Sequence, residues 1–206
     1  MDKEKNIKFK LYQLFLLFVV ASILGYIYEC FTTLLKTGVF YKDTGFSCLP
    51  ILPIYGFGVV ILYILFGTPT NMRILHKKVF TGTDTKSTIL RYITYFVLTA
   101  LVATIFELMV GLFFEYAFGT VLWSYENLPF TFTKYACLQI SMLWGFGATM
   151  VMRFIFDKLY TIATSIPEKK LYNMVNAFLF IWTLDIVFNF GYYYTTGIMF
   201  SILNFI

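Results

Sequence analysis

The sequence is poor in the side chains from which most catalytic and metal sites are built. Its 206 residues contain one histidine, His76, and three cysteines, Cys30, Cys48 and Cys137, with no Cys-x-x-Cys spacing. His76 lies in a polar segment, so Ser-His triads, Cys-His dyads and histidine zinc sites are excluded from the apolar parts of the chain. We therefore expect no metal, no cofactor and no catalytic residue of these classes.

Charged residues are also few in this sequence. Charged residues make up 13% of the chain, whereas hydrophobic residues make up 59% and aromatic residues 21%, with a mean hydropathy of +0.75. This leaves too little polar surface to coat a soluble globule, so the composition indicates a protein of the lipid bilayer. A hydrocarbon core about 30 Å thick takes about 20 apolar residues per helix, which leaves room for five or six spans and for no sizeable soluble domain.

The apolar runs predict an all-α polytopic membrane helical bundle that forms a single transmembrane domain over residues 1–206. About five spans are expected, at about 9–35, 51–67, 89–118, 135–157 and 171–195. We interpret the first run as a retained span, because it is too long for the apolar region of a cleaved signal peptide. The second is the least regular: Pro50 and Pro53 stand at its entrance, so it is either a complete span or a broken, re-entrant one.

Lysine and arginine concentrate in three segments. The N-terminal residues, the 68–91 loop and the 153–170 loop hold thirteen of the sixteen, leaving Lys36, Lys42 and Lys134. The positive-inside rule therefore predicts a multi-pass protein of the cell (plasma) membrane, with the N-terminus in the cytoplasm and the C-terminus outside. The net charge of +5 then indicates contact with anionic membrane lipids. Nucleic acid is not expected as a partner, because no basic stripe carries stacking aromatic residues.

One segment of the sequence occurs twice. Residues 48–58 read CLPILPIYGFG and residues 137–147 read CLQISMLWGFG, so a cysteine, a leucine, an isoleucine and Gly-Phe-Gly recur. The glycines that this repeat singles out as structural are Gly56, Gly58, Gly145 and Gly147. Cys48 and Cys137 occupy equivalent positions, and we expect them to be free thiols rather than a disulfide.

The repeat extends upstream, where a second offset places Glu29 on Glu107. We interpret residues 19–66 and 97–155 as two-helix repeat units, each crossing the membrane twice. Both copies then have the same orientation and are related by an axis along the membrane normal. The predicted helix over 171–195 lies outside the repeat.

Acidic residues inside the predicted spans are the main functional candidates. Glu29 and Glu107 share helix faces with small or hydroxyl-bearing residues, and Asp185 lies nearer mid-membrane with Asn189 one turn later. A charged group in a span costs at least about 2.5–3.5 kcal/mol on insertion scales, so it normally faces the bundle interior or a water-filled cavity. We expect a polar cavity or substrate pathway on the outward side, lined by Glu29, Glu107, Asp185, Tyr55, Trp144 and Asn189.

Each of these features also has a plainer interpretation. The repeated Gly-Phe-Gly can serve helix packing alone, and Asp185 can make an interhelical hydrogen bond to a tyrosine. Glu115, at the outer interface, is expected to be solvated. Trp123 and Tyr125 fit an interfacial aromatic belt better than a lid over the cavity.

Several of these residues lie in runs that resemble a known family. The runs are LGYIYE (24–29), GFSCLPILPIYGFG (45–58), FELMVGLFFEYAFG (106–119), LWSYENLPF (122–130) and CLQISMLWGFG (137–147). Over most of residues 9–155 the chain resembles the "Putative ABC-transporter type IV", or CmpB-like, integral membrane proteins. The resemblance implies a polytopic membrane protein of a kind found in bacteria, with related proteins in animals. By position it marks Glu29, Gly45, Pro50, Pro53, Tyr55, Gly56, Gly58, Glu107, Glu115, Trp123, Tyr125, Trp144 and Gly145.

The chain departs from the family pattern at two places. Ser124 stands where the family tends to have the acid of a Trp-Trp-Asp-Tyr run, and Lys134 with Tyr135 replaces a Gly-Arg before the second cysteine. An activity that uses that Asp–Arg pair would lack both groups here.

These observations favour a membrane permease, or transport protein, for an unidentified small molecule or lipid moiety. The sequence has no GxxxxGK[ST] motif, so energy coupling would require a separate ATPase subunit, and a homo-oligomer is the other assembly we consider. The competing hypothesis is a non-transporting membrane scaffold or regulatory subunit. A carboxylate-based lipid-modifying enzyme is less favoured, because nothing marks a nucleophile or an oxyanion site.

Overall fold

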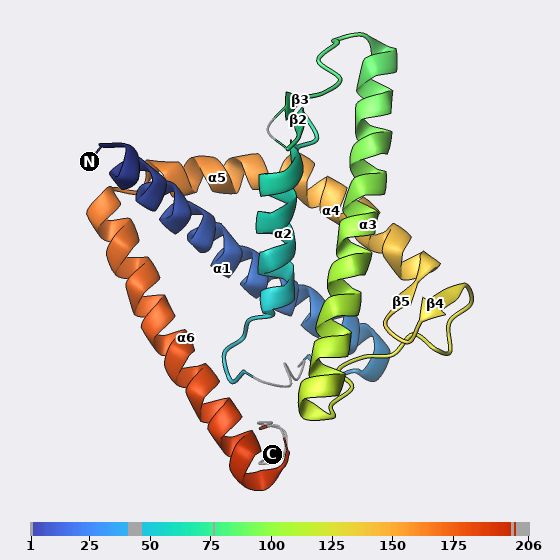
Figure 1. The fold of residues 1–206 in the computed structure, drawn as a ribbon, viewed down its shortest axis with the longest axis vertical. Coiled ribbons are helices and arrows are strands. Elements are labelled where there is room, and N and C mark those ends of the chain that lie inside the picture. The colour runs from blue at the N-terminus through green and yellow to red at the C-terminus, as the bar shows by residue number, and fades with distance from the viewer. Residues whose placement is uncertain (1, 41–46, 76, 199, 201–206) are drawn as a thin grey trace. The chain divides into compact units, whose positions relative to one another are not determined.

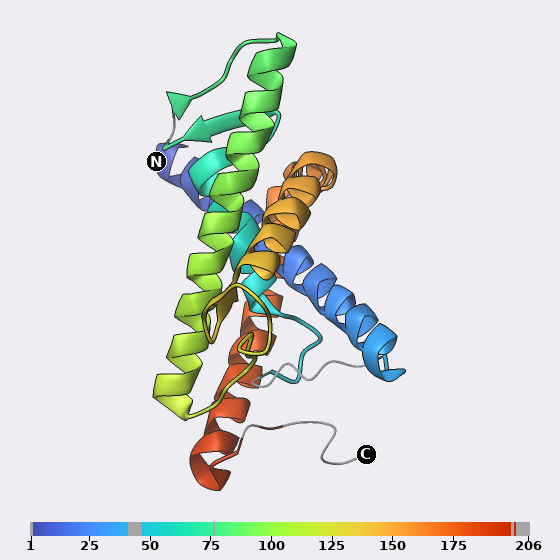
Figure 2. The same ribbon diagram turned by 90° about the vertical axis from the view of Figure 1, so that its right-hand side faces the viewer.

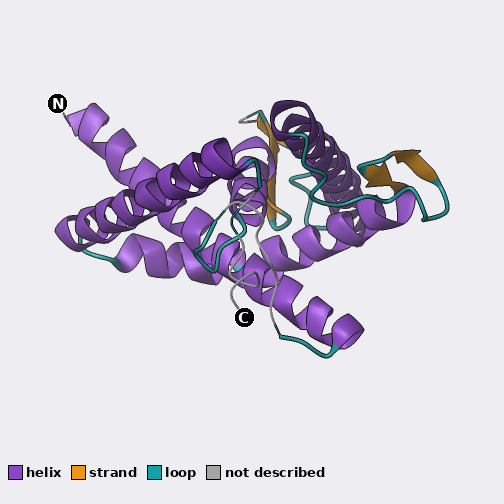
Figure 3. Ribbon diagram, turned by 90° about the horizontal axis from the view of Figure 1, so that it is seen from below, coloured by secondary structure: helices purple, strands orange, loops and turns teal. Residues whose placement is uncertain are grey.

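A computed structural model describes residues 2–40, 47–75, 77–198 and 200, so Lys42, Gly45 and His76 lie outside the described residues. The described chain is mostly helical (Figure 1), and two small sheets interrupt the helices (Figure 3). In chain order the elements are α1 (Asp2–Thr37), α2 (Pro53–Phe66), β1 (Gly67–Thr68), β2 (Asn71–Ile74), β3 (Lys77–Lys78), α3 (Thr85–Phe118), β4 (Thr131–Thr133), β5 (Ala136–Cys137), α4 (Leu138–Phe154), α5 (Phe156–Ser165) and α6 (Glu168–Thr196).

Three helices are long and apolar enough to cross a membrane: α1 from Ile7 to Thr37, α3 and α6. Helices α4 and α5 meet at a bend of 45° and make a fourth candidate if they count as one broken span. The prediction of a multi-pass helical membrane protein is confirmed, with three to four candidate spans instead of about five. Helix α2 accounts for the lower number of spans, because its 14 residues are about 21 Å long and a hydrocarbon core is about 30 Å thick.

Two segments predicted as loops contain regular structure. In the 68–91 segment, β1, β2 and β3 form an antiparallel sheet in which Arg73 lies opposite Lys78, and α3 already begins at Thr85. In the 153–170 segment, α5 continues the helical chain after the bend. These elements were missed because the prediction followed long apolar runs, which reveal neither a short polar hairpin nor an amphipathic helix.

The described chain divides into two compact units, Met1–Phe57 with Tyr160–Ile206, and Gly58–Leu159. In the first unit, α1 and α6 lie side by side near their first turns and run in the same direction (Figure 1). Ring contacts join Phe9 to Tyr172 and Phe15 to Trp182, while the Tyr12 hydroxyl donates to Asn176 at 2.9 Å. The division falls at Gly58, inside the predicted repeat unit 19–66.

In the second unit, α3 and α4 form an antiparallel pair through small and hydroxyl-bearing residues. The Thr104 hydroxyl lies 2.7 Å from the Ser141 hydroxyl, and Thr99 lies 3.4 Å from Thr149 further along the pair. Thr99 is completely buried. The β4–β5 hairpin, which leads into α4, lies beside α3 (Figure 2). This arrangement places β4, β5 and the chain before them close to the acidic residues of α3.

The first turn of α3 is capped by Asp84, whose carboxylate accepts the Ser87 backbone N–H at 2.9 Å. Hydrogen bonding to the Ser87 side chain, and then to this backbone N–H, lowers the pKa of Asp84 below its ordinary value, because both bonds favour the charged form. The carboxylate therefore stabilises the folded helix start above the unfolded pKa, and this contribution is lost as the pH falls through the lowered folded pKa.

We expect Asp84→Ala to speed hydrogen exchange at the Ser87 amide at neutral pH. Asp84→Ser, which caps without titrating, should keep its protection on acidification, and equal acid sensitivity of both chains would contradict this account.

Candidate functional site

Glu29 and Tyr55 form a carboxylate–aromatic pair in the first unit. Glu29 lies on α1, Tyr55 lies in the first turn of α2, and the Tyr55 hydroxyl donates to Glu29 Oε1 at 2.5 Å. Gly25, one turn before Glu29, makes the approach possible, because a Cβ atom there would collide with the Tyr55 side chain. The start of α2 is also fixed by the Leu52 N–H, which donates to the Ser22 carbonyl at 3.0 Å.

Glu107 and Trp144 form the corresponding pair in the second unit. Glu107 lies on α3 and is 7% exposed, and its Oε1 accepts the indole N–H of Trp144, on α4, at 2.8 Å. The same oxygen accepts the hydroxyl of Tyr125, from the chain between α3 and β4, at 2.9 Å. Two donors thus hold a nearly buried carboxylate, which is the arrangement that a buried charge requires.

The two pairs occupy positions that the sequence repeat predicts to be equivalent. In both, the aromatic residue directly before Gly-Phe-Gly donates to the acid of the preceding long helix. They differ in access, since Glu29 is half-buried whereas Glu107 is buried beneath a second donor, Tyr125.

The first glycine of each Gly-Phe-Gly is a close packing point. A Cβ atom on Gly56 would collide with Ser22 and Phe18, and one on Gly145 would lie 2.8 Å from the Ala100 Cβ atom. The second glycine of each motif, Gly58 and Gly147, has no atom within 4 Å of such a Cβ. Close helix approach therefore requires only the first glycine of each motif.

Glu115 has a partly exposed side chain and is bound by two residues of the β4–β5 hairpin. It accepts the Lys134 ammonium at 2.6 Å and the Tyr135 hydroxyl at 2.7 Å. The hydrogen bond to Glu115 raises the pKa of Lys134, because it favours the charged ammonium. The Tyr135 ring lies against Gly111, where an added Cβ would approach it to 2.5 Å. Lys134 and Tyr135, which stand in place of the family's Gly-Arg, thus bind the β4–β5 hairpin to α3.

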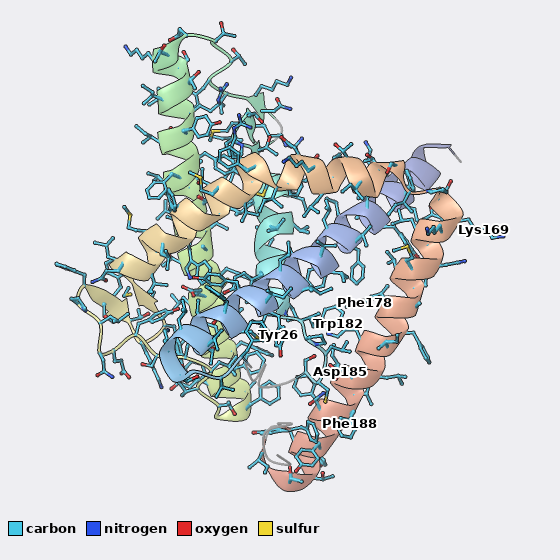
Figure 4. All side chains as sticks on the ribbon, turned by 180° about the vertical axis from the view of Figure 1, so that it is seen from behind. Tyr26, Lys169, Phe178, Trp182, Asp185 and Phe188 are labelled. Carbon is cyan, nitrogen blue, oxygen red and sulfur yellow. The ribbon has the colours of Figure 1, made fainter. Side chains whose placement is uncertain are left out.

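Asp185 is held by the segment that precedes α2. Its carboxylate accepts the Ser47 hydroxyl at 2.6 Å, the Cys48 backbone N–H at 2.8 Å and the Asn189 amide at 3.1 Å. Asn189 is completely buried and also contacts the Cys48 sulfur. Figure 4 shows Asp185 on the side of α6 that faces α1, together with Trp182. The hydrogen-bonded interpretation of Asp185 is the one seen, although its partners are not a tyrosine.

The remaining predicted residues have local roles. Pro53 is the first residue of α2, where its missing N–H is tolerated, and Pro50 lies in the non-helical stretch before it. Trp123 packs edge-on against Tyr135 at 6.1 Å between ring centroids. Cys30, Cys48 and Cys137 are free thiols. A shallow, open hollow on the surface of α3 is lined by Met109, Leu112, Phe113, Tyr116 and Ala117.

Three features of the site were not predicted from the sequence. Tyr125 as a partner of Glu107 was missed because the predicted second repeat unit is longer than the first, and Tyr125 lies in the extra segment near residues 121–132, which has no counterpart in the first unit. Ser47 and Cys48 were missed as partners of Asp185 because one donor is a backbone N–H. The bond between Lys134 and Glu115 was missed because the pattern of apolar runs carries no signal that relates these two residues.

Comparison with known proteins gives one match. The model of the family described as "Putative ABC-transporter type IV" matches residues 16–190. No curated protein and no solved structure matches the chain significantly. The matched range contains both carboxylate–aromatic pairs and Asp185 with its partners. Because this range covers most of the 206 residues, the chain belongs to the family of membrane proteins described as "Putative ABC-transporter type IV".

Proposed function

We propose that the protein is a membrane permease for a small molecule or lipid moiety, in which the Glu29–Tyr55 and Glu107–Trp144 pairs bind the substrate. One observation supports this most: an acid inside a long apolar helix meets an aromatic donor at the same repeated position in each unit. Acids in membrane spans normally face a pathway or a protein interior, since lipid exposure is costly.

The chemistry of the pairs suggests the substrate class. An ionised carboxylate has about four acceptor sites, and Glu29 accepts one hydrogen bond from the described residues, that of Tyr55. Glu29 thus has acceptor capacity for a ligand, and the phenol beside it offers an aromatic face. We propose a substrate with a cationic or hydrogen-bond-donating group, such as an amine or a hydroxyl.

The direct test is mass spectrometry of the small molecules and lipids that copurify with the protein. A compound retained by the parent and lost from the Glu29→Gln and Glu107→Gln variants would support the proposal. An identical set of compounds on all three proteins would overturn it. Because the sequence has no ATP-binding motif, we propose that a separate ATPase subunit supplies energy for transport.

A second candidate is a non-transporting scaffold or regulatory subunit. The observation that favours it is that Glu107 is buried with two donors and Asp185 is bonded by three groups. Acids satisfied in this way can specify how elements pack without touching a ligand.

We further propose that residues 19–66 and 97–155 are parallel copies of one two-helix unit. Corresponding glycines support this: Gly56 packs against Ser22 and Phe18, as Gly145 packs against Ala100 and Phe96. These partners match one another at the same offset as Glu29 and Glu107.

We also propose that the N-terminus is cytoplasmic. The parallel packing of α1 and α6 supports this, because it puts the basic N-terminal residues and the basic start of α6 at the same end of the first unit. A thiol introduced at Asn127 should then react with a membrane-impermeant reagent in intact cells, whereas one at Thr83 should not. Both positions are exposed, and the parent chain serves as the control for its own cysteines. Equal labelling of both, or the reverse pattern, would contradict this orientation.

A further inference from the structure

Arg73 and Arg91 are two guanidinium groups without an acidic partner among the described residues. Arg73, on β2, donates through Nη2 to the Tyr63 carbonyl at 3.0 Å and lies over the Tyr63 ring at 4.9 Å. Arg91, on α3, donates through Nη1 to the Phe80 carbonyl at 3.3 Å. In both residues the Nε atom is buried and has no hydrogen-bond partner in the part of the chain that the structure describes. A buried unpaired donor is costly, and more so when it is charged.

Both arginines bind backbone carbonyls of one stretch of chain, residues 63–80. A Cβ atom on Gly67 would lie 3.4 Å from Arg73 Nε, and the Gly67 carbonyl accepts the Tyr95 hydroxyl at 3.0 Å. Tyr95 follows Arg91 by one turn of α3. The carbonyl that Arg91 contacts belongs to Phe80, just after the strand that pairs with β2.

The surroundings of this pair are basic on one side and apolar on the other. Lys77 and Lys78, on β3, are exposed, and Lys78 lies directly opposite Arg73 in the sheet. Leu75, directly after β2, and Leu90, next to Arg91 on α3, are 69% and 45% exposed. A ligand with an anionic head and an apolar body would contact both surfaces.

We propose that Arg73 and Arg91 bind the phosphate of an anionic membrane phospholipid, with Lys77 and Lys78 beside the headgroup and Leu75 and Leu90 against the acyl chain. The planar fork of a guanidinium suits phosphate oxygens, and one terminal nitrogen of each arginine carries no hydrogen bond to the described residues. Basic pockets at the ends of membrane helices bind anionic headgroups in this way. This inference is independent of the proposed permease function, because it uses none of the residues of the carboxylate–aromatic pairs.

The test is native mass spectrometry of the purified full-length protein with phosphatidylglycerol and with phosphatidylcholine of the same acyl chains. The parent should bind phosphatidylglycerol preferentially. Arg73→Gln and Arg91→Gln should each weaken that binding about tenfold or more, as expected for loss of a charge-assisted hydrogen bond. Arg153→Gln, which removes an arginine from α4, is the matched control and should change the affinity less than about twofold.

Three results would overturn the proposal. Equal binding of the two lipids by the parent would show that the headgroup charge is not recognised. An equal loss in Arg153→Gln would indicate general attraction to basic protein. Binding of inorganic phosphate as strong as that of phosphatidylglycerol, at the same concentration, would show a site for free phosphate instead. Because Arg73 also holds the Tyr63 carbonyl, Arg73→Lys is measured too: it keeps the charge, loses the fork and should bind less tightly than the parent.

Discussion

Leucine at Gly56 or Gly145 is expected to destabilise the protein strongly in detergent. Each glycine lies against another helix so closely that even a Cβ atom would collide with or crowd its neighbours. The neighbours of Gly145 include the backbone oxygen of Phe96, which cannot move aside as a flexible side chain can. Overpacking typically costs about 1–3 kcal/mol, and we expect the upper part of this range or more. Thermal melting of each purified variant measures the effect.

The same motifs supply matched controls. Gly58 and Gly147 stand two residues further along the same helices, and a Cβ atom there meets nothing within 4 Å. Gly58→Leu and Gly147→Leu should therefore melt within about 0.5 kcal/mol of the parent, as ordinary surface substitutions do. If all four variants melt alike, close helix approach is not the role of the first glycine.

Glutamine at Glu29 or Glu107 is expected to reduce retention of the copurifying ligand about tenfold or more while leaving the protein folded. Glutamine has nearly the same shape, and its amide oxygen can still accept from Tyr55 or from Trp144. The change therefore removes the charge rather than the shape of the pair. A charge-assisted hydrogen bond contributes about 1.5–3 kcal/mol, which corresponds to tenfold or more in affinity. Mass spectrometry measures retention, and melting is recorded on the same samples.

A double-mutant cycle within each pair separates binding from packing. Tyr55→Phe removes only the hydroxyl that bonds Glu29, so if the two residues hold the ligand as a unit, the double change should cost less than the sum of the single ones. Glu126→Gln, an exposed acid near Ser124, serves as the control for loss of charge. Unchanged retention in both Glu29→Gln and Glu107→Gln, with altered melting alone, would favour the scaffold.

The sequence was sufficient to predict the membrane class and the three longest helices, α1, α3 and α6. The pairing of Glu29 with Tyr55 could not be predicted, because the contact depends on the missing side chain of Gly25 and not on any spacing in the sequence. Helix α5 was missed because its apolar residues are distributed as in an amphipathic helix. The bonding of Asp185 depends on a backbone N–H, which every non-proline residue carries and no sequence pattern reveals.

Helix α2 is shorter than the hydrocarbon core of a membrane is thick. A helix of 14 residues leaves about 9 Å of a 30 Å hydrocarbon core for other chain to fill. The non-helical residues 47–52 before it can lie at that depth because their N–H groups bond to protein: Leu52 to the Ser22 carbonyl, and Cys48 to Asp185. A thinner bilayer would reduce this hydrophobic mismatch, whereas a thicker one would place more of residues 47–52 among acyl chains and rely more heavily on those two bonds.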